Sequence, residues 1–143
     1  MRVTQEADYA MRLTHILSLD REATRGAMSL SAEAGVPERY TLKILSKLRT
    51  AGLVDSVKGV HGGYRLAKAP AEISMLDVLC AIDGDVMLTK CLAGAACTRM
   101  GNRNDDCLFR CVYNHIGQGV RRRLSSVSMQ DVLDGTIDFE GLM

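Results

Sequence analysis

Apolar residues recur every three or four positions at the start of the chain, which is the period of a helix with one buried face. This pattern predicts a helix over residues 4–19, with Thr4 as its N-terminal cap. Residues 20–27 are polar and contain a glycine, so we expect a loop there. The buried stripe of the predicted helix is made of Ala7, Ala10, Met11, Thr14 and Leu17.

Two further helices are predicted after this loop. The first is short, residues 29–34, and the second extends to about residue 51. Residues 35–37, Gly-Val-Pro, lie between them, and the proline suits a first helical turn because its missing N–H costs nothing there. A short helix, a tight turn and a longer helix form the helix-turn-helix pattern. The spacing in the second helix places its buried face at Thr41, Ile44, Leu45 and Leu48.

A β-hairpin is predicted directly after the second helix. Residues 53–57 and 64–66 are rich in strand-favouring residues, and the glycine-rich residues 58–63 form the turn between them. A hairpin in this place is a wing. The expected fold class is therefore mainly α with a small β-hairpin wing, a winged helix-turn-helix followed by a long dimerisation helix.

The rest of the chain is predicted to be helical. Ser74 caps a helix that extends to about residue 82, and Ser128 caps a short helix over residues 129–133. Between them, residues 107–127 predict a long helix, because one apolar stripe contains Phe109, Val112, Tyr113, Ile116, Val120, Leu124 and Val127. A domain this small cannot cover so long a stripe by itself, so we expect a homodimer.

Four of the five cysteines lie within residues 91–111, which read CLAGAACTRMGNRNDDCLFRC. They are Cys91, Cys97, Cys107 and Cys111. Thiolates are soft ligands that suit zinc and iron–sulfur clusters. Only the last two cysteines have the spacing of a zinc-ligand pair, and the longer gaps suit a loop wrapped over a cluster. Cys107 stands at the predicted start of a helix, which favours a thiolate.

Other residues that bind metals elsewhere have simpler explanations here. Cys80 lies in the apolar run of a short helix and is predicted to pack in the core. His15 and His115 are single helical histidines, which are more often surface residues than ligands. The three arginines at residues 121–123 are predicted to be a solvated run at a helix end.

The net charge of +1 conceals an asymmetry between the two halves. Residues 1–70 contain 11 Lys and Arg against 7 Asp and Glu, whereas residues 71–143 contain 7 against 10. A basic front half suits contact with nucleic acid. Because the chain lacks both an apolar run of about 18 residues and the apolar centre of a signal peptide, we expect a cytoplasmic protein without a membrane partner. In that compartment clustered cysteines are more often ligands or redox groups than disulfides.

Outward side chains on the second helix and on the wing are the predicted DNA contacts. On the helix they are Arg39, Tyr40, Leu42, Lys43 and Lys47. Lys and Arg favour guanine edges and phosphates, and a leucine can touch a thymine methyl group. The basic residues of the wing suit a minor groove or the phosphate backbone. They are Lys58, His61 and Arg65.

Several stretches in a fixed order carry a resemblance to a known family. They are the opening MRVTQEADYAMRLT, the helix-turn-helix LSAEAGVPERYTLKILSKLRTAGLVDS, the wing and next helix VKGVHGGYRLAKAPAEISMLDVLCAIDG, the cysteine motifs CLAGAAC and CLFRC, and SMQDVL. Together they resemble the Rrf2 family of bacterial winged-helix regulators over nearly the whole chain. The resemblance implies a homodimer, joined through the long helix, that binds palindromic double-stranded promoter DNA.

The resemblance also implies an iron–sulfur cluster, 2Fe–2S or 4Fe–4S. The family's three loop ligands correspond to Cys91, Cys97 and Cys107, and some members add an Asp from the other subunit, at the position of Asp8. Here the gap between the second and third cysteine is longer than is usual in the family. Cys111 is additional, near the place where other members have a ligand histidine. The implied fourth ligand is therefore Cys111, Asp8 or neither.

These observations predict four regions. They are a winged helix-turn-helix DNA-binding region (1–70), a connecting helix (71–88), a cluster-binding loop (89–106), and a dimerisation helix with a C-terminal helix (107–143).

The predicted function is that of a transcription regulator, a repressor, whose DNA affinity is set by the cluster. The alternative is a winged-helix regulator with a zinc site or a thiol–disulfide switch at the same cysteines. An enzyme is not expected, because the chain has no thioredoxin-type C-x-x-C, Rossmann glycine pattern or catalytic triad.

Overall fold

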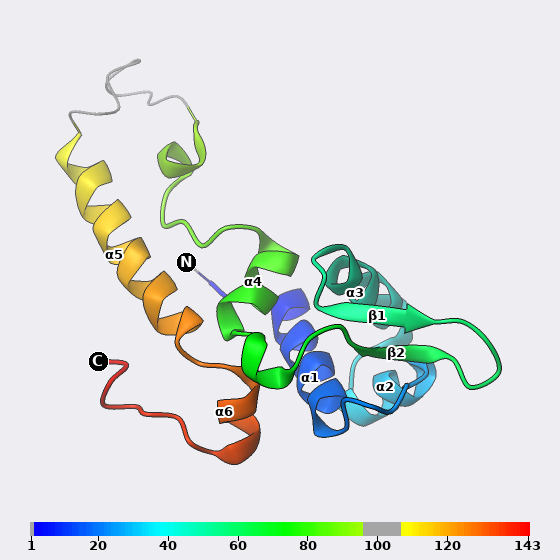
Figure 1. Cartoon of the computed structure of the whole chain (residues 1–143). Helices are drawn as coiled ribbons and strands as arrows, with labels where there is room; N and C mark the ends of the chain where they lie inside the picture. The colour runs from blue at the N-terminus through cyan, green and yellow to red at the C-terminus, as the bar shows by residue number, and fades with distance from the viewer. Residues whose placement is uncertain (1, 96–106) are drawn as a thin grey trace.

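The front half of the chain folds as a winged helix (Figure 1). The computed structural model describes residues 2–95 and 107–143. The elements in chain order are α1 (Gln5–Leu19), α2 (Ala27–Ala34), α3 (Glu38–Thr50), β1 (Val54–Val57), β2 (Gly63–Leu66), η1 (Pro70–Glu72), α4 (Met75–Asp83), η2 (Lys90–Ala93), α5 (Leu108–Ser125) and α6 (Met129–Asp134). The predicted fold class, mainly helical with a two-stranded wing, is confirmed.

Helix α1 is the centre of the core. Its cap is the predicted one, because the hydroxyl oxygen of Thr4 accepts a hydrogen bond from the N–H of Ala7 at 3.1 Å. The helix packs against α2 and α3 and also against α4 and α6. Four of the five residues of the predicted stripe are buried and Met11 is half-buried, while Leu13 and Ile16, which were not predicted, are buried as well. The enclosed helix fixes the positions of the elements around it.

Helices α2 and α3 form the helix-turn-helix. Gly35 ends α2 in the left-handed conformation, with a φ of 64°, which a glycine adopts without a steric penalty. Helix α2 begins at Ala27, two residues before the predicted start. The predicted inward face of α3 is confirmed, since all four of its members are fully buried: Thr41, Ile44, Leu45 and Leu48.

The wing is an antiparallel hairpin tied to the loop before α2. Val54 pairs with Leu66 and Val57 with Gly63. Arg25 adds a bridge, because its N–H and C=O each make a 2.8 Å hydrogen bond with the backbone of Tyr64. Gly63 is required at this crossing, since its φ is 151° and a Cβ there would lie 2.5 Å from the carbonyl oxygen of Arg25.

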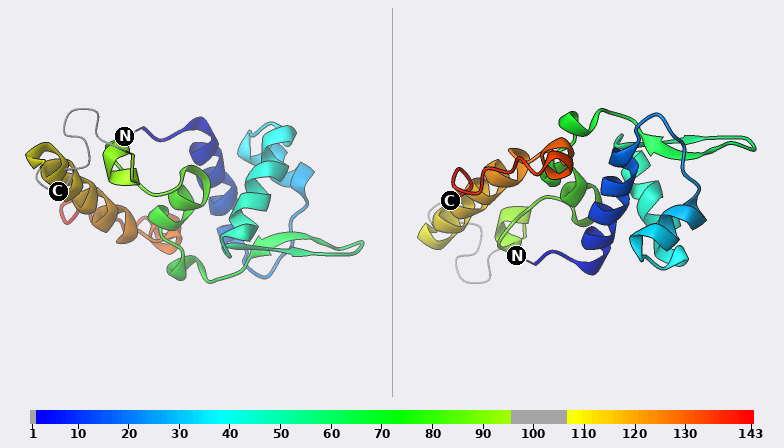
Figure 2. Two further views of the ribbon diagram at one scale, coloured as in Figure 1. Left: turned by 90° about the horizontal axis from the view of Figure 1, so that it is seen from above. Right: turned by 90° about the horizontal axis from the view of Figure 1, so that it is seen from below.

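The two predicted serine caps are confirmed, and they hold the C-terminal helix against the body. Ser74 and Ser128 each form a capping box, with Asp77 and Asp131 respectively. The two serines also face each other in an antiparallel bridge. Helix α6 consequently returns to pack beside α1, as Figure 2 shows from above and below.

Helix α5 projects from this body, away from the wing (Figures 1 and 2). It begins at Leu108, with Cys107 as its N-cap, and ends at Ser125. The predicted stripe divides into two parts. Val120 and Leu124 are half-buried and Val127 is buried beyond the helix end, so the chain itself covers this part. The other part is exposed and consists of Phe109, Val112, Tyr113 and Ile116.

One prediction about a single residue was wrong. Cys80 is only half-buried, on a groove that it shares with Ser46 and Thr50, because α4 turns Val78 and Leu79 toward the core instead. The arginines of residues 121–123 lie near the end of α5, where Arg122 and Arg123 are exposed as predicted, but two of the three arginines also have partners. Arg121 forms an ion pair with Asp85, and Arg123 donates to the backbone carbonyls of the last two residues.

Within residues 2–95 and 107–143, every helix is too short or too polar to span a bilayer.

Candidate DNA-binding face and cysteine site

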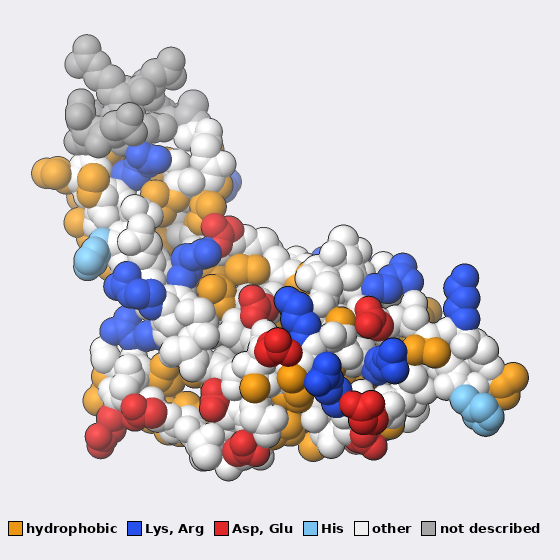
Figure 3. Space-filling view, in the orientation of Figure 1, with side chains coloured by type: hydrophobic (Ala, Val, Ile, Leu, Met, Phe, Trp, Pro, Cys, Tyr) orange, Lys and Arg blue, Asp and Glu red, His pale blue; other side chains and the backbone are white. Residues whose placement is uncertain are grey.

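The exposed side of α3 carries most of the side chains predicted to touch DNA. Arg39, Leu42 and Lys43 are exposed there, and Leu42 is 49% exposed although it is apolar. In the view of Figure 3, Lys and Arg side chains are interspersed with Asp and Glu over the winged-helix half of the molecule. A mixed surface of this kind binds phosphates only where its cations are not already neutralised.

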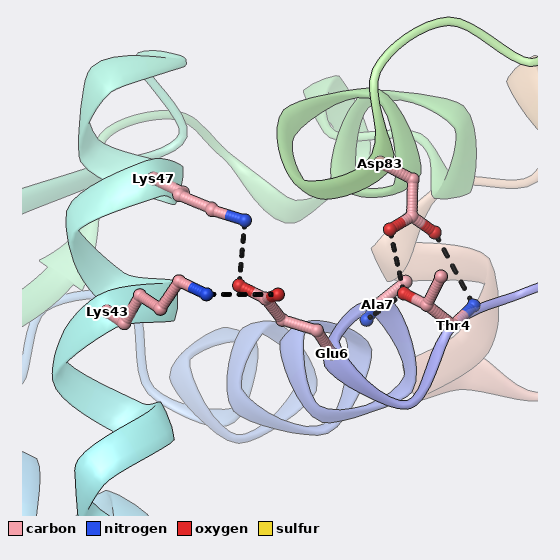
Figure 4. A network of polar contacts seen from close by, with 6 residues as sticks. All are labelled: Thr4, Glu6, Ala7, Lys43, Lys47 and Asp83. Carbon is pink, nitrogen blue, oxygen red and sulfur yellow. Dashed lines mark hydrogen bonds and ion pairs between the residues drawn. The ribbon is translucent and has the colours of Figure 1, made fainter.

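Two of the cations on α3 are engaged within the chain (Figure 4). Lys47 Nζ lies 2.7 Å from Glu6 Oε1, and Lys43 Nζ lies 3.5 Å from Glu6 Oε2. The hydrogen bond and the charge of Lys47, together with Lys43, lower the pKa of Glu6, although burial opposes the shift. Glu6 therefore carries its negative charge beside α3, the second or recognition helix of the helix-turn-helix.

Tyr40 faces sideways rather than outward. Its ring is half-buried and meets the ring of Tyr9 of α1 at a centroid distance of 5.9 Å. The guanidinium of Arg39 lies over the same ring at 4.8 Å. Tyr40 consequently supports both the α1–α3 contact and the orientation of Arg39.

The wing presents its three predicted contacts to solvent. Lys58, His61 and Arg65 are all exposed. The backbone of the turn is tied to the loop before α2, because the hydroxyl of Thr24 donates a hydrogen bond to the carbonyl oxygen of His61 at 2.7 Å. Val60, beside the histidine, is 98% exposed and forms an apolar tip.

The cysteines are divided between η2 and the start of α5. Cys91 is half-buried in η2, with Thr89 Oγ1 3.1 Å from its Sγ. Cys107 is half-buried at the N-cap of α5, and Cys111 is exposed one turn later. Cys97 lies outside the described residues. Cys111 lines a groove between α5 and the 85–92 segment, which also contains Leu92, the neighbour of Cys91.

Among the described residues, no three His, Cys, Asp or Glu side chains are gathered closely enough to hold a metal ion. Asp8 of α1 is exposed and forms an ion pair with Arg12 at 2.7 Å. His115 is exposed on α5, while His15 is half-buried on α1.

Sequence reasoning missed the acidic partners of this region: Glu6, Asp83 and Asp85. Asp83 accepts a 2.7 Å hydrogen bond from the Thr4 hydroxyl and thereby ties the end of α4 to the start of α1. An acidic residue in the first turn of a helix, such as Glu6, is already explained by its favourable interaction with the helix dipole. Its position in the sequence therefore gave no sign that it also pairs with lysines of another helix. Only the packing of α1 on α3 brings it to the lysines.

Comparison with known proteins agrees with this geometry. Residues 3–135 match the family model described as Rrf2, iron-dependent transcriptional regulator. The HTH-type transcriptional regulator IscR of Aliivibrio salmonicida is 33% identical over 136 residues, which are 93% of this chain and 77% of that protein.

Solved structures support the fold. The T. potens IscR structure aligns with a TM-score of 0.73 at 24% identity, over 100% of this chain and 92% of that one. The structure of CymR, the global cysteine regulator of B. subtilis, aligns with a TM-score of 0.75 at 22% identity, over 96% and 99%. These relatives are regulators rather than enzymes, in agreement with the prediction. The chain therefore belongs to the Rrf2 family and is a DNA-binding transcriptional regulator with a winged-helix fold.

Proposed function

We propose that the chain is a dimeric repressor whose affinity for promoter DNA responds to an iron–sulfur cluster held by Cys91, Cys97 and Cys107. The observation that carries this proposal is the position of the cysteines. Cys91 and Cys107 flank the segment that joins the winged-helix body to α5, so a group bound there is well placed to act on both.

The donor set suits such a cluster. Thiolates are the usual ligands of iron–sulfur clusters. The first-turn N–H groups of α5 favour a negatively charged ligand at Cys107, and the Thr89 hydroxyl is within hydrogen-bonding distance of the Cys91 sulfur. When bound, the cluster would supply a centre that responds to iron supply or to oxidants. The chain's own residues would shield it, since both cysteines are half-buried.

Cys111 and Asp8 are the two candidates for a fourth ligand. Cys111 lies one helical turn from Cys107 on the groove toward η2, which favours a ligand from the same chain. Asp8 is exposed and forms an ion pair with Arg12, so as a ligand from a second subunit it would have to exchange that partner for the cluster. A Cys111→Ser variant and an Asp8→Asn variant separate the two, because only loss of the true ligand changes the cluster's absorption spectrum.

The exposed face of α5 supports the dimer. Leu108, Phe109, Val112 and Ile116 are exposed apolar residues spaced along one side of the helix. Figure 3 shows hydrophobic side chains along the projecting part of the molecule. A contiguous apolar surface of this kind on a regulator marks a protein interface. Pairing of two copies through α5 would place two recognition helices for the half-sites of a palindrome.

The four regions predicted from the sequence fit this scheme. Residues 1–70 bind DNA through α3 and the wing, residues 71–88 connect, residues 89–106 hold the cluster, and residues 107–143 contain the dimer helix. The predicted DNA contacts that remain outward are Arg39, Leu42, Lys43, Lys58, His61 and Arg65. Tyr40 and Lys47 are half-buried at the side of α3 and support the helix rather than contact DNA directly. The regulator would act in the cytoplasm, where the promoter DNA is.

The test is reconstitution without oxygen. The protein is incubated with iron and sulfide, and visible absorbance, iron and sulfide contents are measured before and after exposure to an oxidant. Affinity for DNA upstream of its own gene is measured in parallel. Cys107→Ser is expected to abolish the colour, whereas Cys80→Ser, at a half-buried thiol on another groove, is expected to retain it. A colourless wild-type product would rule out the cluster.

A zinc site or thiol switch is the second candidate, favoured by the Cys107–Cys111 pair. The two residues lie in one turn, since the N–H of Cys111 donates to the carbonyl of Cys107 at 3.1 Å. The likeness of the fold to a cysteine regulator adds support. Metal analysis of protein purified without oxygen distinguishes the candidates, because zinc without iron and sulfide favours this one.

A further inference from the structure

We propose that Glu6 is a positioning residue for DNA binding. It holds Lys43 and Lys47 of α3 in an intramolecular cluster, the Glu6 clamp, and thereby limits how many phosphates the recognition helix neutralises. This role rests on the proposed placement of α3 against DNA. It predicts a protein whose non-specific binding is weaker than the number of cations on α3 would indicate.

The clamp is built from both oxygens of one carboxylate (Figure 4). Oε1 faces Lys47 at 2.7 Å and Oε2 faces Lys43 at 3.5 Å. The Glu6 side chain is 23% exposed and that of Lys47 is 34% exposed, so this pair is partly shielded from water. Ion pairs at such sites are screened less by salt than fully exposed pairs.

The position of Glu6 is fixed by its surroundings. Thr4 caps α1 and donates its hydroxyl proton to Asp83 Oδ1 at 2.7 Å, which anchors the first turn of α1 to the end of α4. The neighbouring Ala7 is fully buried. The carboxylate is therefore presented to α3 from an anchored turn.

The clamp acts on one row of cations. Arg39, Lys43 and Lys47 are four residues apart in sequence, so they follow one another along the same side of α3. Arg39 stacks over Tyr40 and is not part of the clamp. Glu6 thus takes the last two cations of the row and leaves the first for DNA.

Phosphates and Glu6 compete for the same ammonium groups. Each phosphate neutralised by a cation contributes about 0.9 to the slope of log affinity against log salt concentration. Removing the Glu6 charge would free two lysines per subunit and steepen that slope by up to roughly 1.8 per subunit. The gain is independent of sequence, so binding to random DNA and binding to the operator should tighten by similar factors.

The experiment compares wild type with Glu6→Gln, which keeps the shape and removes the charge. Affinity is measured at several salt concentrations for the fragment upstream of its own gene and for a scrambled fragment of equal length. We expect a steeper salt dependence and tighter binding to both fragments, with little change in the specificity ratio. Glu6→Asp retains the charge on a shorter side chain and should lie between the two.

Two controls separate the clamp from general charge effects. Glu140→Gln removes one negative charge at the exposed far end of the chain and should leave the slope unchanged. In a Lys43→Gln/Lys47→Gln background, the additional Glu6→Gln change should have no effect on the slope. An unchanged slope in the single variant, or an effect that persists without the lysines, would overturn the role of Glu6. Failure of the wild type to bind either fragment at low salt would instead refute the proposed placement of α3.

Discussion

Ile116 offers the sharpest test of the proposed dimer. It lies on the exposed apolar face of α5, one turn after Val112 and two turns after Phe109, and it is 50% exposed. Replacement by alanine removes most of its apolar surface without changing charge. Replacement by aspartate places a carboxylate at the same point.

The size of the effect follows from the exposed fraction. Complete burial of an isoleucine side chain is worth roughly 1.5–3 kcal/mol, so a half-exposed one still has about half of this to gain from a partner. A two-fold symmetric interface contains each position twice. Ile116→Ala should therefore cost about 1.5–3 kcal/mol of dimerisation free energy, which is about a 10- to 140-fold increase in the dimer dissociation constant. Ile116→Asp should cost more, because it also requires burial of a charge.

Sedimentation equilibrium over a range of protein concentrations measures this constant directly. Val60→Asp is the matched control, because Val60 is 98% exposed at the wing tip, far from α5, and its substitution should leave association unchanged (Figure 1). Unfolding by denaturant shows whether each variant is folded. The reasoning fails if Ile116→Asp dimerises like the wild type, or if the control weakens the dimer equally.

Three further predictions concern stability and the wing. Leu48→Ala, at a fully buried position of α3, should lower the free energy of unfolding by about 2–5 kcal/mol in denaturant titrations, whereas Leu42→Ala on the exposed side of the same helix should have little effect. Gly63→Ala should destabilise the protein by about 1–3 kcal/mol, because its Cβ would collide with the Arg25 carbonyl, while Gly26→Ala, with open space around it, should be nearly neutral in the same assay. Asp131 has its pKa lowered by the hydrogen bonds from the Ser128 hydroxyl and N–H, so its contribution to stability is present above the unfolded-state pKa of about 4 and is lost as pH falls through the lower folded-state value. Asp131→Asn should therefore be less stable than wild type in unfolding experiments at neutral pH and should approach it in acid, while Glu140→Gln should show no such change.

The periodicity of apolar residues was sufficient to predict the order of the elements. Caps such as Thr4, Ser74 and Ser128 and the four buried positions of α3 were predicted correctly, because these features depend on neighbours within a few residues. The family and its DNA-binding function also followed from local motifs. Cys91, Cys97 and Cys107 as ligands, with Cys111 or Asp8, stay predictions that the reconstitution experiment tests.

Contacts between distant segments could not be predicted in this way. The stripe of α5 reads as one continuous face, yet the chain covers its end and leaves Phe109 to Ile116 exposed, because residues 127–129 return to the body beside α4. Cys80 lies in an apolar run but faces a groove, since its direction is set by how α4 packs on α1 and α3.

The recognition helix α3 shows most clearly the difference between what nearby residues determine and what distant contacts determine. The 3.6-residue repeat of α3 determines which side chains are outward, and so Lys43 and Lys47 were expected to be free for DNA. Their actual partner, Glu6, lies 37 and 41 positions earlier and reaches them only because α1 packs across α3. Local sequence thus determines the elements and their faces, whereas the charge available on a face depends on long-range packing, which no periodicity encodes.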